Sequence, residues 1–188
     1  MPRRRLLVGG TLAAAAGAYL GLVTGRVTVD LGWGRSRRSL GPLAVTIAAP
    51  RELVFDVIAA PYLGRTPTAM AGKLRVLERG ADMVLAEHYT PVGSGLVATT
   101  VETVRFTRPE RVGFRLLRGP VPYVAEEFLL QEQAGATTLH YRGELAADLW
   151  ALGRLWGDIV GRRWDATVAA SLASIRGEAE RRAAIRPG

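Results

Sequence analysis

Residues 123–160 read YVAEEFLLQEQAGATTLHYRGELAADLWALGRLWGDIV, and this stretch decides the fold. Apolar and polar residues alternate along residues 123–133 and again along 137–146, a period of two that predicts two strands. The small residues between them predict a hairpin turn. From about residue 148 to residue 183 the apolar spacing becomes helical, which predicts one long amphipathic helix closing the domain.

The apolar stripe of this helix is expected to face the sheet, and it comprises Leu149, Leu152, Trp156, Ile159, Val160, Trp164, Val168, Leu172 and Ile175. Gly153, Gly157 and Gly161 recur at every fourth position, although glycine weakens a helix by about 1 kcal/mol relative to alanine. We interpret these glycines as sites of close packing or a kink. The alternative is that their missing side chains widen an entrance for a ligand.

Upstream of the hairpin, short apolar runs alternate with turn residues. A first strand is expected over residues 43–48, followed by a short helix that starts at Pro50 and ends at Pro61. Further strands are expected over residues 74–78, 83–90, 96–106 and 111–117. Because short turns join consecutive strands, the sheet should be antiparallel. The order predicts an α+β domain in which a curved sheet of six to seven strands wraps around the C-terminal helix.

Four short segments within this order carry a family resemblance. They are PRELVFDVI at residues 50–58, RPERVGF at 108–114, GATTLHY at 135–141 and LGRLW at 152–156. Together they resemble the START-like helix-grip superfamily (SRPBCC), which includes polyketide cyclase/dehydratase and lipid-transfer domains. The resemblance covers about residues 43–183 and implies a hydrophobic cavity between sheet and helix. It also implies a lipid, sterol, polyketide or aromatic ligand and, in some members, an enzymatic reaction.

The N-terminal residues differ in composition from this domain. Three arginines precede an uncharged run over residues 6–24, which would span roughly 28 Å as a helix, close to the hydrocarbon thickness of a bilayer. We predict a single-pass transmembrane anchor over residues 1–25. A cleaved export signal is the alternative, because the basic start resembles a twin-arginine pattern, and this start favours an extracytoplasmic domain. Gly17, Gly21 and Gly25 recur every four residues, the spacing found where membrane helices pair closely, and would form a homodimer face. The alternative is that a segment rich in glycine and alanine produces this spacing by chance.

Basic charge is concentrated beside this anchor. The chain has a net charge of +8, and residues 1–39 hold seven arginines against one acid, Asp30, which accounts for +6. This distribution favours a membrane surface over nucleic acid as the partner, since a nucleic-acid binder carries its basic stripe on the folded domain. Residues 26–42 are expected to form a basic juxtamembrane linker with Trp33 near the lipid headgroups, and residues 184–188 a tail.

Alternation along the predicted strands indicates which side chains face the cavity. The expected ligand-binding residues are Phe114, Glu126, Phe128 and Tyr141 from the strands and Trp156 from the helix. A carboxyl group in apolar surroundings has a raised pKa and can act as an acid or a base. Glu126 and Tyr141 are therefore candidate catalytic residues as well as ligand contacts. The alternative is that Glu126 lies near the end of the sheet in water or pairs with an arginine.

No complete catalytic motif is present in the sequence. There is no G-x-S-x-G, H-E-x-x-H or Gly-rich phosphate loop, and there is no cysteine. His88 is the third candidate for proton transfer, but two histidines without a carboxylate at ligand spacing predict no metal site, and we expect no cofactor. We favour membrane-tethered binding of a lipid-like or polyketide/aromatic small molecule. A cyclase or dehydratase reaction and a structural membrane-associated partner without a ligand are the alternatives.

Overall fold

The computed structural model describes residues 16–64 and 72–185. Residues 16–23 are helical, and an extended segment leads from them into the sheet. The elements that follow are β1 (Ser36–Ile47), α2 (Arg51–Leu63), β2 (Leu74–Arg79), β3 (Met83–Gly93), β4 (Leu96–Thr107), β5 (Arg111–Arg118), β6 (Tyr123–Gln133), β7 (Ala136–Ala147) and α4 (Trp150–Ile185).

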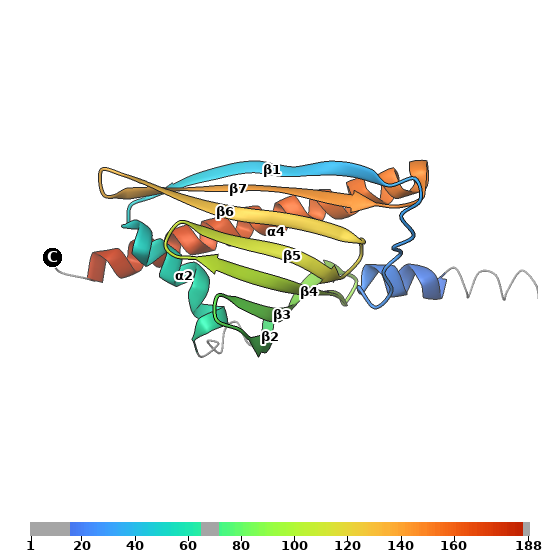
Figure 1. Cartoon of the computed structure of the whole chain (residues 1–188), viewed down its shortest axis with the longest axis horizontal. Helices are drawn as coiled ribbons and strands as arrows, with labels where there is room; N and C mark the ends of the chain where they lie inside the picture. The colour runs from blue at the N-terminus through green and yellow to red at the C-terminus, as the bar shows by residue number, and fades with distance from the viewer. Residues whose placement is uncertain (1–15, 65–71, 186–188) are drawn as a thin grey trace, which may run out of the picture.

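The seven strands form one antiparallel sheet in the order β1-β7-β6-β5-β4-β3-β2. Strands β2 to β7 are neighbours in both chain and sheet, as their short turns require. Strand β1 closes one edge by pairing with β7, with Ser36 opposite Ala147 and Ile47 opposite Thr137. Helix α4 runs along one face of the curved sheet, and α2 lies beside it near one end (Figure 1). The predicted α+β architecture is confirmed.

The core lies between this face of the sheet and the two helices. Every second residue of β7 is buried where it faces α4, including Leu139, Tyr141 and Leu145, because strand side chains alternate between faces. Phe55 of α2 and Val104 of β4 complete the opposite side of the same core and are fully buried. This layer holds the sheet and the helices in place around the side chains described below.

Strand β1 begins at Ser36, so residues 36–42 belong to the sheet and the linker expected over residues 26–42 is too long. The strand forms a bulge at Gly41 and Pro42. The register with β7 shifts between Leu40 and Leu43, and Gly41 has a φ of 73°. Because β1 is an edge strand, the proline removes no hydrogen bond that the sheet needs.

The arginines expected to face lipid headgroups instead form ion pairs with the domain. Arg35 Nε donates to Asp148 Oδ1 at 2.7 Å, and Arg38 Nη2 donates to Asp165 Oδ2 at 3.0 Å. Arg37 pairs with Glu144 across the β1–β7 ladder. Folding of β1 against β7 and α4 brings these acids next to the basic cluster, which the linear sequence does not show.

In the first turns of α4, the residues that face the sheet differ from the predicted apolar stripe. Leu152 and Ile159 are exposed, whereas Gly153, Gly157 and Gly161 are buried. A Cβ atom at Gly153 would lie 1.9 Å from Asp148 O, and one at Gly161 would lie 1.9 Å from Arg38 Nη1. The glycines therefore allow α4 to approach β1 and β7 closely, which confirms the close-packing interpretation.

The structure does not support a homodimer face through Gly17, Gly21 and Gly25. The helical residues end at 23, and Gly25 is buried with a φ of 69°, where a Cβ atom would lie 2.1 Å from Thr99 O. A Cβ atom at Gly21 would lie 2.9 Å from Val27 Cγ2. Most of the predicted membrane span lies outside the described residues. Within the described residues, no helix is both long and apolar enough to cross a membrane.

We predict that Gly153→Ala lowers the free energy of unfolding by about 1–3 kcal/mol, because the added methyl group would meet the backbone oxygen of Asp148. Gly177→Ala is the matched control in the same helix. Nothing lies within 4 Å of its added Cβ atom, so it should raise the free energy of unfolding by about 0.5–1 kcal/mol. Urea unfolding curves measure both effects. Equal stabilisation by the two substitutions would contradict the close approach of α4 to the sheet.

Candidate functional site

Polar side chains from two helices and four strands meet between the sheet and α4. We call them the interior polar cluster, which comprises Tyr62 of α2, His88 of β3, Thr100 and Glu102 of β4, Glu126 of β6, Tyr141 of β7 and Trp164 of α4. Within the described residues, no group of three or more potential ligands is placed to hold a metal ion. The cluster offers carboxyl, hydroxyl, imidazole and indole groups.

Glu126 is held inside by two donors on the same oxygen. Its Oε2 accepts hydrogen bonds from Tyr141 Oη and Trp164 Nε1, each at 2.6 Å. Gly143 lies opposite Glu126 across the β6–β7 ladder, and a Cβ atom there would lie 2.7 Å from Glu126 Cβ. The glycine thus leaves room for the carboxyl group. Glu126 and Tyr141 face inward, as their alternation predicts.

His88 and Glu102 form the second part of the cluster. His88 Nε2 lies 2.9 Å from Tyr62 Oη, and its Nδ1 lies 3.3 Å from Glu102 Oε2. This Nδ1 atom is buried and makes no hydrogen bond of good geometry with a residue that the structure describes. Thr100 Oγ1 donates to Glu102 Oε1 at 2.6 Å. The orientation of His88, ambiguous in the sequence, is inward.

Sequence reasoning missed Glu102 and Tyr62. Glu102 could have been found, because Ala98, Thr100, Glu102 and Val104 alternate as the buried face of β4. Tyr62 had no such signal, since Pro61 was expected to end the helix, and α2 continues to Leu63.

Burial controls the protonation of the cluster. Loss of solvent, together with the nearby charge of Glu102, raises the pKa of Glu126 to about 8, and loss of solvent raises the pKa of Glu102 to about 7. Loss of solvent also lowers the pKa of His88 to about 4, so the imidazole is neutral at pH 7. It raises the pKa of Tyr141 above its ordinary value. Since Oε2 of Glu126 accepts two hydrogen bonds, the proton of its neutral form belongs on Oε1.

Several side chains of this region are not fully buried. The side chain of His88 keeps 21% of its surface accessible, and Tyr62, Phe114, Glu126 and Trp164 are also only partly buried. Yet loss of solvent is the largest cause of the shifted pKa of Glu126, His88 and Tyr62. These groups are therefore poorly solvated, although part of their surface remains accessible.

Aromatic rings form the walls of this region. Four rings form a row in which each contacts the next. The ring centroids lie 6.2 Å apart for Tyr62 and Phe114, 5.6 Å apart for Phe114 and Phe128, and 5.6 Å apart for Phe128 and Tyr141. Phe106 lies 5.9 Å from Tyr62 by the same measure. Phe114 and Phe128 therefore occupy the inward positions that alternation predicts.

Trp156 lies elsewhere. Its Nε1 donates to Pro120 O at 2.7 Å, and its ring meets Tyr19 edge to face at 6.4 Å. These contacts hold it at the end of the sheet, so the expectation that it shares a site with Glu126 is wrong. Trp164, about two turns further along α4, takes that position because its Nε1 reaches Glu126.

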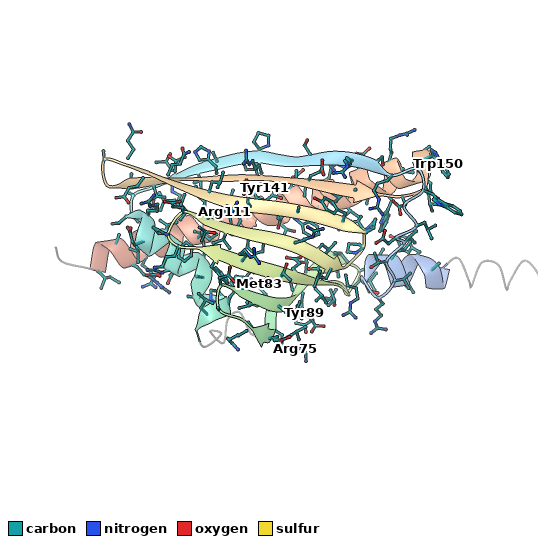
Figure 2. The ribbon with its side chains drawn as sticks, in the orientation of Figure 1. Arg75, Met83, Tyr89, Arg111, Tyr141 and Trp150 are labelled. Carbon is teal, nitrogen blue, oxygen red and sulfur yellow. The ribbon has the colours of Figure 1, made fainter. Side chains whose placement is uncertain are left out.

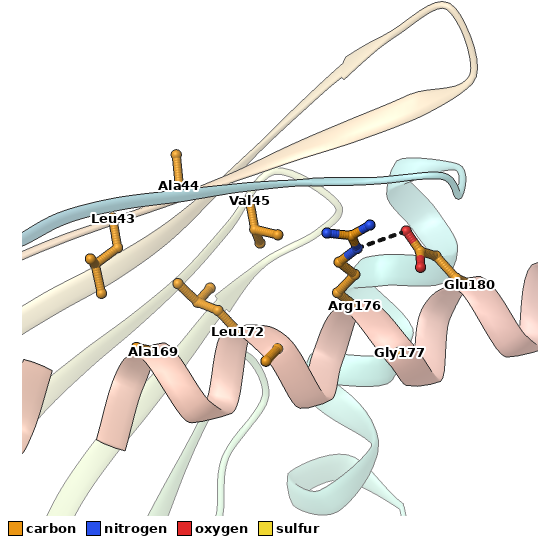
Figure 3. Close-up of a pocket in the computed structure, with 9 residues that line it drawn as sticks. Leu43, Ala44, Val45, Ala169, Leu172, Arg176, Gly177 and Glu180 are labelled. Carbon is orange, nitrogen blue, oxygen red and sulfur yellow. Dashed lines mark hydrogen bonds and ion pairs between the residues drawn. The ribbon is translucent and has the colours of Figure 1, made fainter. Parts of the chain in front are cut away.

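A separate open groove of about 410 Å³ lies between β1 and α4 (Figure 3). Leu43 and Val45 line it from β1, and Leu172 lines it from α4. Arg176 and Glu180 pair with each other beside it at 3.1 Å. None of the five expected ligand-binding residues lines this groove, and its charged groups already have partners. We therefore place the candidate site at the interior polar cluster.

Comparison with known proteins supports the fold. No family model and no curated protein sequence matches the chain. Among solved structures, it is similar to the ZhuI aromatase/cyclase from Streptomyces sp. R1128, with a TM-score of 0.61 and 19% identity, covering 79% of this chain and 95% of that one. A START superfamily protein from Mycobacterium smegmatis gives a TM-score of 0.53 and 14% identity, covering 77% of this chain and 97% of that one.

The di-domain ARO/CYC StfQ from the steffimycin biosynthetic pathway gives a TM-score of 0.65 and 15% identity. The match covers 80% of this chain and 53% of StfQ, so the chain spans about half of that protein. At these identities the likeness establishes the fold. The chain has the START-like (SRPBCC) helix-grip fold, as the sequence motifs indicated.

The pH dependence of stability tests the protonation of Glu126. Its folded pKa is raised to about 8 from an ordinary value of 4.5, so between these values the folded protein keeps a proton that the unfolded chain has released. The free energy of unfolding should therefore fall as pH rises from about 4.5 to about 8. We predict that Glu126→Gln makes this fall smaller by about 1 kcal/mol or more.

Urea unfolding at several pH values measures this slope. Glu127→Gln is the matched control, because Glu127 points to the opposite face of β6 and binds Arg142 Nε at 2.6 Å. An unchanged slope in a folded Glu126→Gln variant would show that the Glu126 carboxyl is ionised in the folded protein.

Proposed function

We propose that this domain encloses a space beside the interior polar cluster, between the sheet and the helices, and that it binds a predominantly apolar small molecule there. The observation that carries the proposal is that Glu102 is buried and Glu126 is partly buried, and that neither has an arginine or lysine partner among the described residues. Burying ionisable groups in this way costs stability. A pair of strongly shifted carboxyl groups beside an unfilled space is typical of a functional site.

The lining of the space indicates the kind of ligand. Aromatic rings from α2 and four strands suit a flat or extended apolar body. The two carboxyl groups suit a small number of polar groups on that body, which they would orient by hydrogen bonding. The likeness to polyketide aromatase/cyclases supports an aromatic or polyketide-like ligand over a simple fatty chain.

We predict that Phe114→Trp weakens binding of the neutral apolar probe N-phenyl-1-naphthylamine by about tenfold or more, because the larger ring occupies the enclosed space. Leu117→Trp is the control on the same strand, since Leu117 is exposed on the opposite face. Probe fluorescence measures binding, and native mass spectrometry of the purified full chain followed by solvent extraction identifies any resident molecule.

A filled interior would give a different result. The unsubstituted protein would bind no probe and carry no extractable molecule. Phe114→Trp would then lower the free energy of unfolding by about 1–3 kcal/mol through overpacking. That outcome would favour a structural role for the domain.

A cyclase or dehydratase reaction is the second candidate function. The observation that favours it is the geometry at Glu126, where Tyr141 and Trp164 both donate to Oε2 and leave Oε1 as the oxygen that carries the proton when burial keeps this carboxyl neutral. Such a group can protonate a leaving hydroxyl or a carbonyl oxygen of a bound molecule. The neutral imidazole of His88 and the carboxyl of Glu102 could accept a proton nearby.

If the domain is an enzyme of this kind, Glu126→Gln should bind its substrate without converting it. Molecules extracted from the unsubstituted protein and from the variant, both produced in the natural host, would then differ in mass, by one water for a dehydration. Identical extracted molecules in equal amounts would remove Glu126 from any reaction and leave binding as the function.

We further propose that the N-terminal residues tether this domain to a membrane, with the domain on the extracytoplasmic side. The uncharged run over residues 6–24 and the arginines before it support the tether, and the export-like start supports the side. The tether would restrict the domain to ligands that are present at or near that membrane.

A further inference from the structure

Five large apolar side chains are exposed at the end of the molecule where α4 begins. Leu31, Trp33, Trp150, Leu152 and Leu155 are 54%, 67%, 61%, 65% and 60% exposed. We call them the apolar end patch. Figure 2 shows Trp150 projecting from this end. Of these five residues, only Leu152 belongs to the apolar stripe of α4 that was expected to face the sheet.

The members of the patch are held together by the backbone. Leu149 N donates to Trp33 O at 2.8 Å, and Trp150 N donates to Gly34 O at 3.0 Å, so the two loops lie side by side. Leu152 and Leu155 are three residues apart and therefore share one face of the first turns of α4. The patch is thus one surface made from two distant parts of the sequence.

A buried carboxylate fixes the loop that presents Leu31 and Trp33. Asp148 Oδ2 accepts hydrogen bonds from the backbone amides of Leu31 and Gly32 at 2.6 and 2.8 Å. Its Oδ1 accepts from Arg35 Nε at 2.7 Å, and this hydrogen bond is the main cause that lowers the pKa of Asp148 to about 2. These bonds tie the loop to Asp148, although two of its apolar side chains face water.

The second loop is held in a strained conformation. Leu149 and Trp150 have φ values of 77° and 49°, in the left-handed region that such residues rarely adopt. Gly34 makes this possible, because a Cβ atom there would lie 2.3 Å from the Trp150 ring. A strained backbone that keeps indole rings exposed to water does not make the protein more soluble. Contiguous exposed apolar surface of this kind marks an interaction site.

The course of the chain indicates what covers the patch. Tyr19 meets Trp156 of α4, which places residues 16–23 beside the start of α4 at this same end (Figure 1). The ten residues that precede them, residues 6–15, are uncharged in the sequence. Exposed Arg154 lies between Leu152 and Leu155 in the first turns of α4 and adds positive charge there. Tryptophan near lipid headgroups, with arginine beside it, is the usual composition of a membrane interface.

We propose that the apolar end patch docks onto the surface of a lipid bilayer, with Trp33 and Trp150 at headgroup level. Docking there would orient α4 and the sheet with their near ends toward the lipid. The inference extends the proposed tether and is separable from it, because a tethered domain can also stand away from the bilayer. It does not depend on the interior ligand site.

Single labels test the docking in the full chain. The sequence has no cysteine, so each introduced cysteine is unique. Leu155→Cys places a nitrobenzoxadiazole label in the patch, and Gln133→Cys places one at the end of β6, at the opposite end of the sheet (Figure 1). In vesicles of phosphatidylcholine and phosphatidylglycerol, the label at 155 should shift to the blue and lose most of its emission to brominated lipid. The label at 133 should do neither.

A second pair of variants shows whether the patch itself causes this result. Trp33→Ser combined with Leu152→Ser should abolish the quenching of the label at 155. Leu63→Ser combined with Leu77→Ser removes exposed leucines elsewhere and should leave the quenching unchanged. These exposed substitutions are not expected to disturb folding, which circular dichroism checks.

Three outcomes would overturn the proposal. The label at 155 could remain solvent-like in vesicles, or the labels at 133 and 155 could be quenched equally. A concentration-dependent blue shift without lipid would instead show that a second copy of the chain covers the patch. Alkaline extraction of the vesicles reports on the tether alone, because it removes docked proteins but not spanning ones.

Discussion

The packing of α4 against β1 and β7 is the interaction on which the rest of the structure depends. Gly153, Gly157 and Gly161 allow the helix to approach this edge of the sheet, and Arg38 joins β1 to Asp165 on the helix. The closest strand neighbours of α4 are β1 and β7, so the helix packs against one edge of the seven-stranded sheet. The strands toward the other edge curve away from α4. The interior polar cluster lies between these strands and the helix.

Within that region, the chemistry follows from low solvation. A carboxyl group on the surface would be ionised at neutral pH and screened by water. Glu126 sits instead among aromatic rings, with Tyr141 and Trp164 as donors to one oxygen, and burial favours its neutral form. A neutral acid of this kind can donate a hydrogen bond to a bound molecule. Binding and proton transfer are thus two uses of the same arrangement.

The same packing explains why the start of α4 is apolar on its outer side. Glycine occupies the inner face of the first turns, so Leu152 and Leu155 turn outward beside Trp33 and Trp150. Asp148 joins these parts through the 31–35 loop. One short junction between β7 and α4 therefore sets the distance of the helix from the sheet and the composition of the molecule's end.

The sequence alone determined the order of the strands and helices, because period-two and helical spacing are local properties. It also determined that Phe114, Glu126, Phe128 and Tyr141 face inward. It could not place Trp156 or the outer leucines of α4, since an apolar stripe does not reveal that glycines make the closest contact. The ion pairs of Arg35 and Arg38, the meeting of Glu102 with His88 and the joining of Trp33 to Trp150 arise between segments far apart in the chain. Only the tertiary structure decides such contacts, because they depend on where folding brings distant residues together.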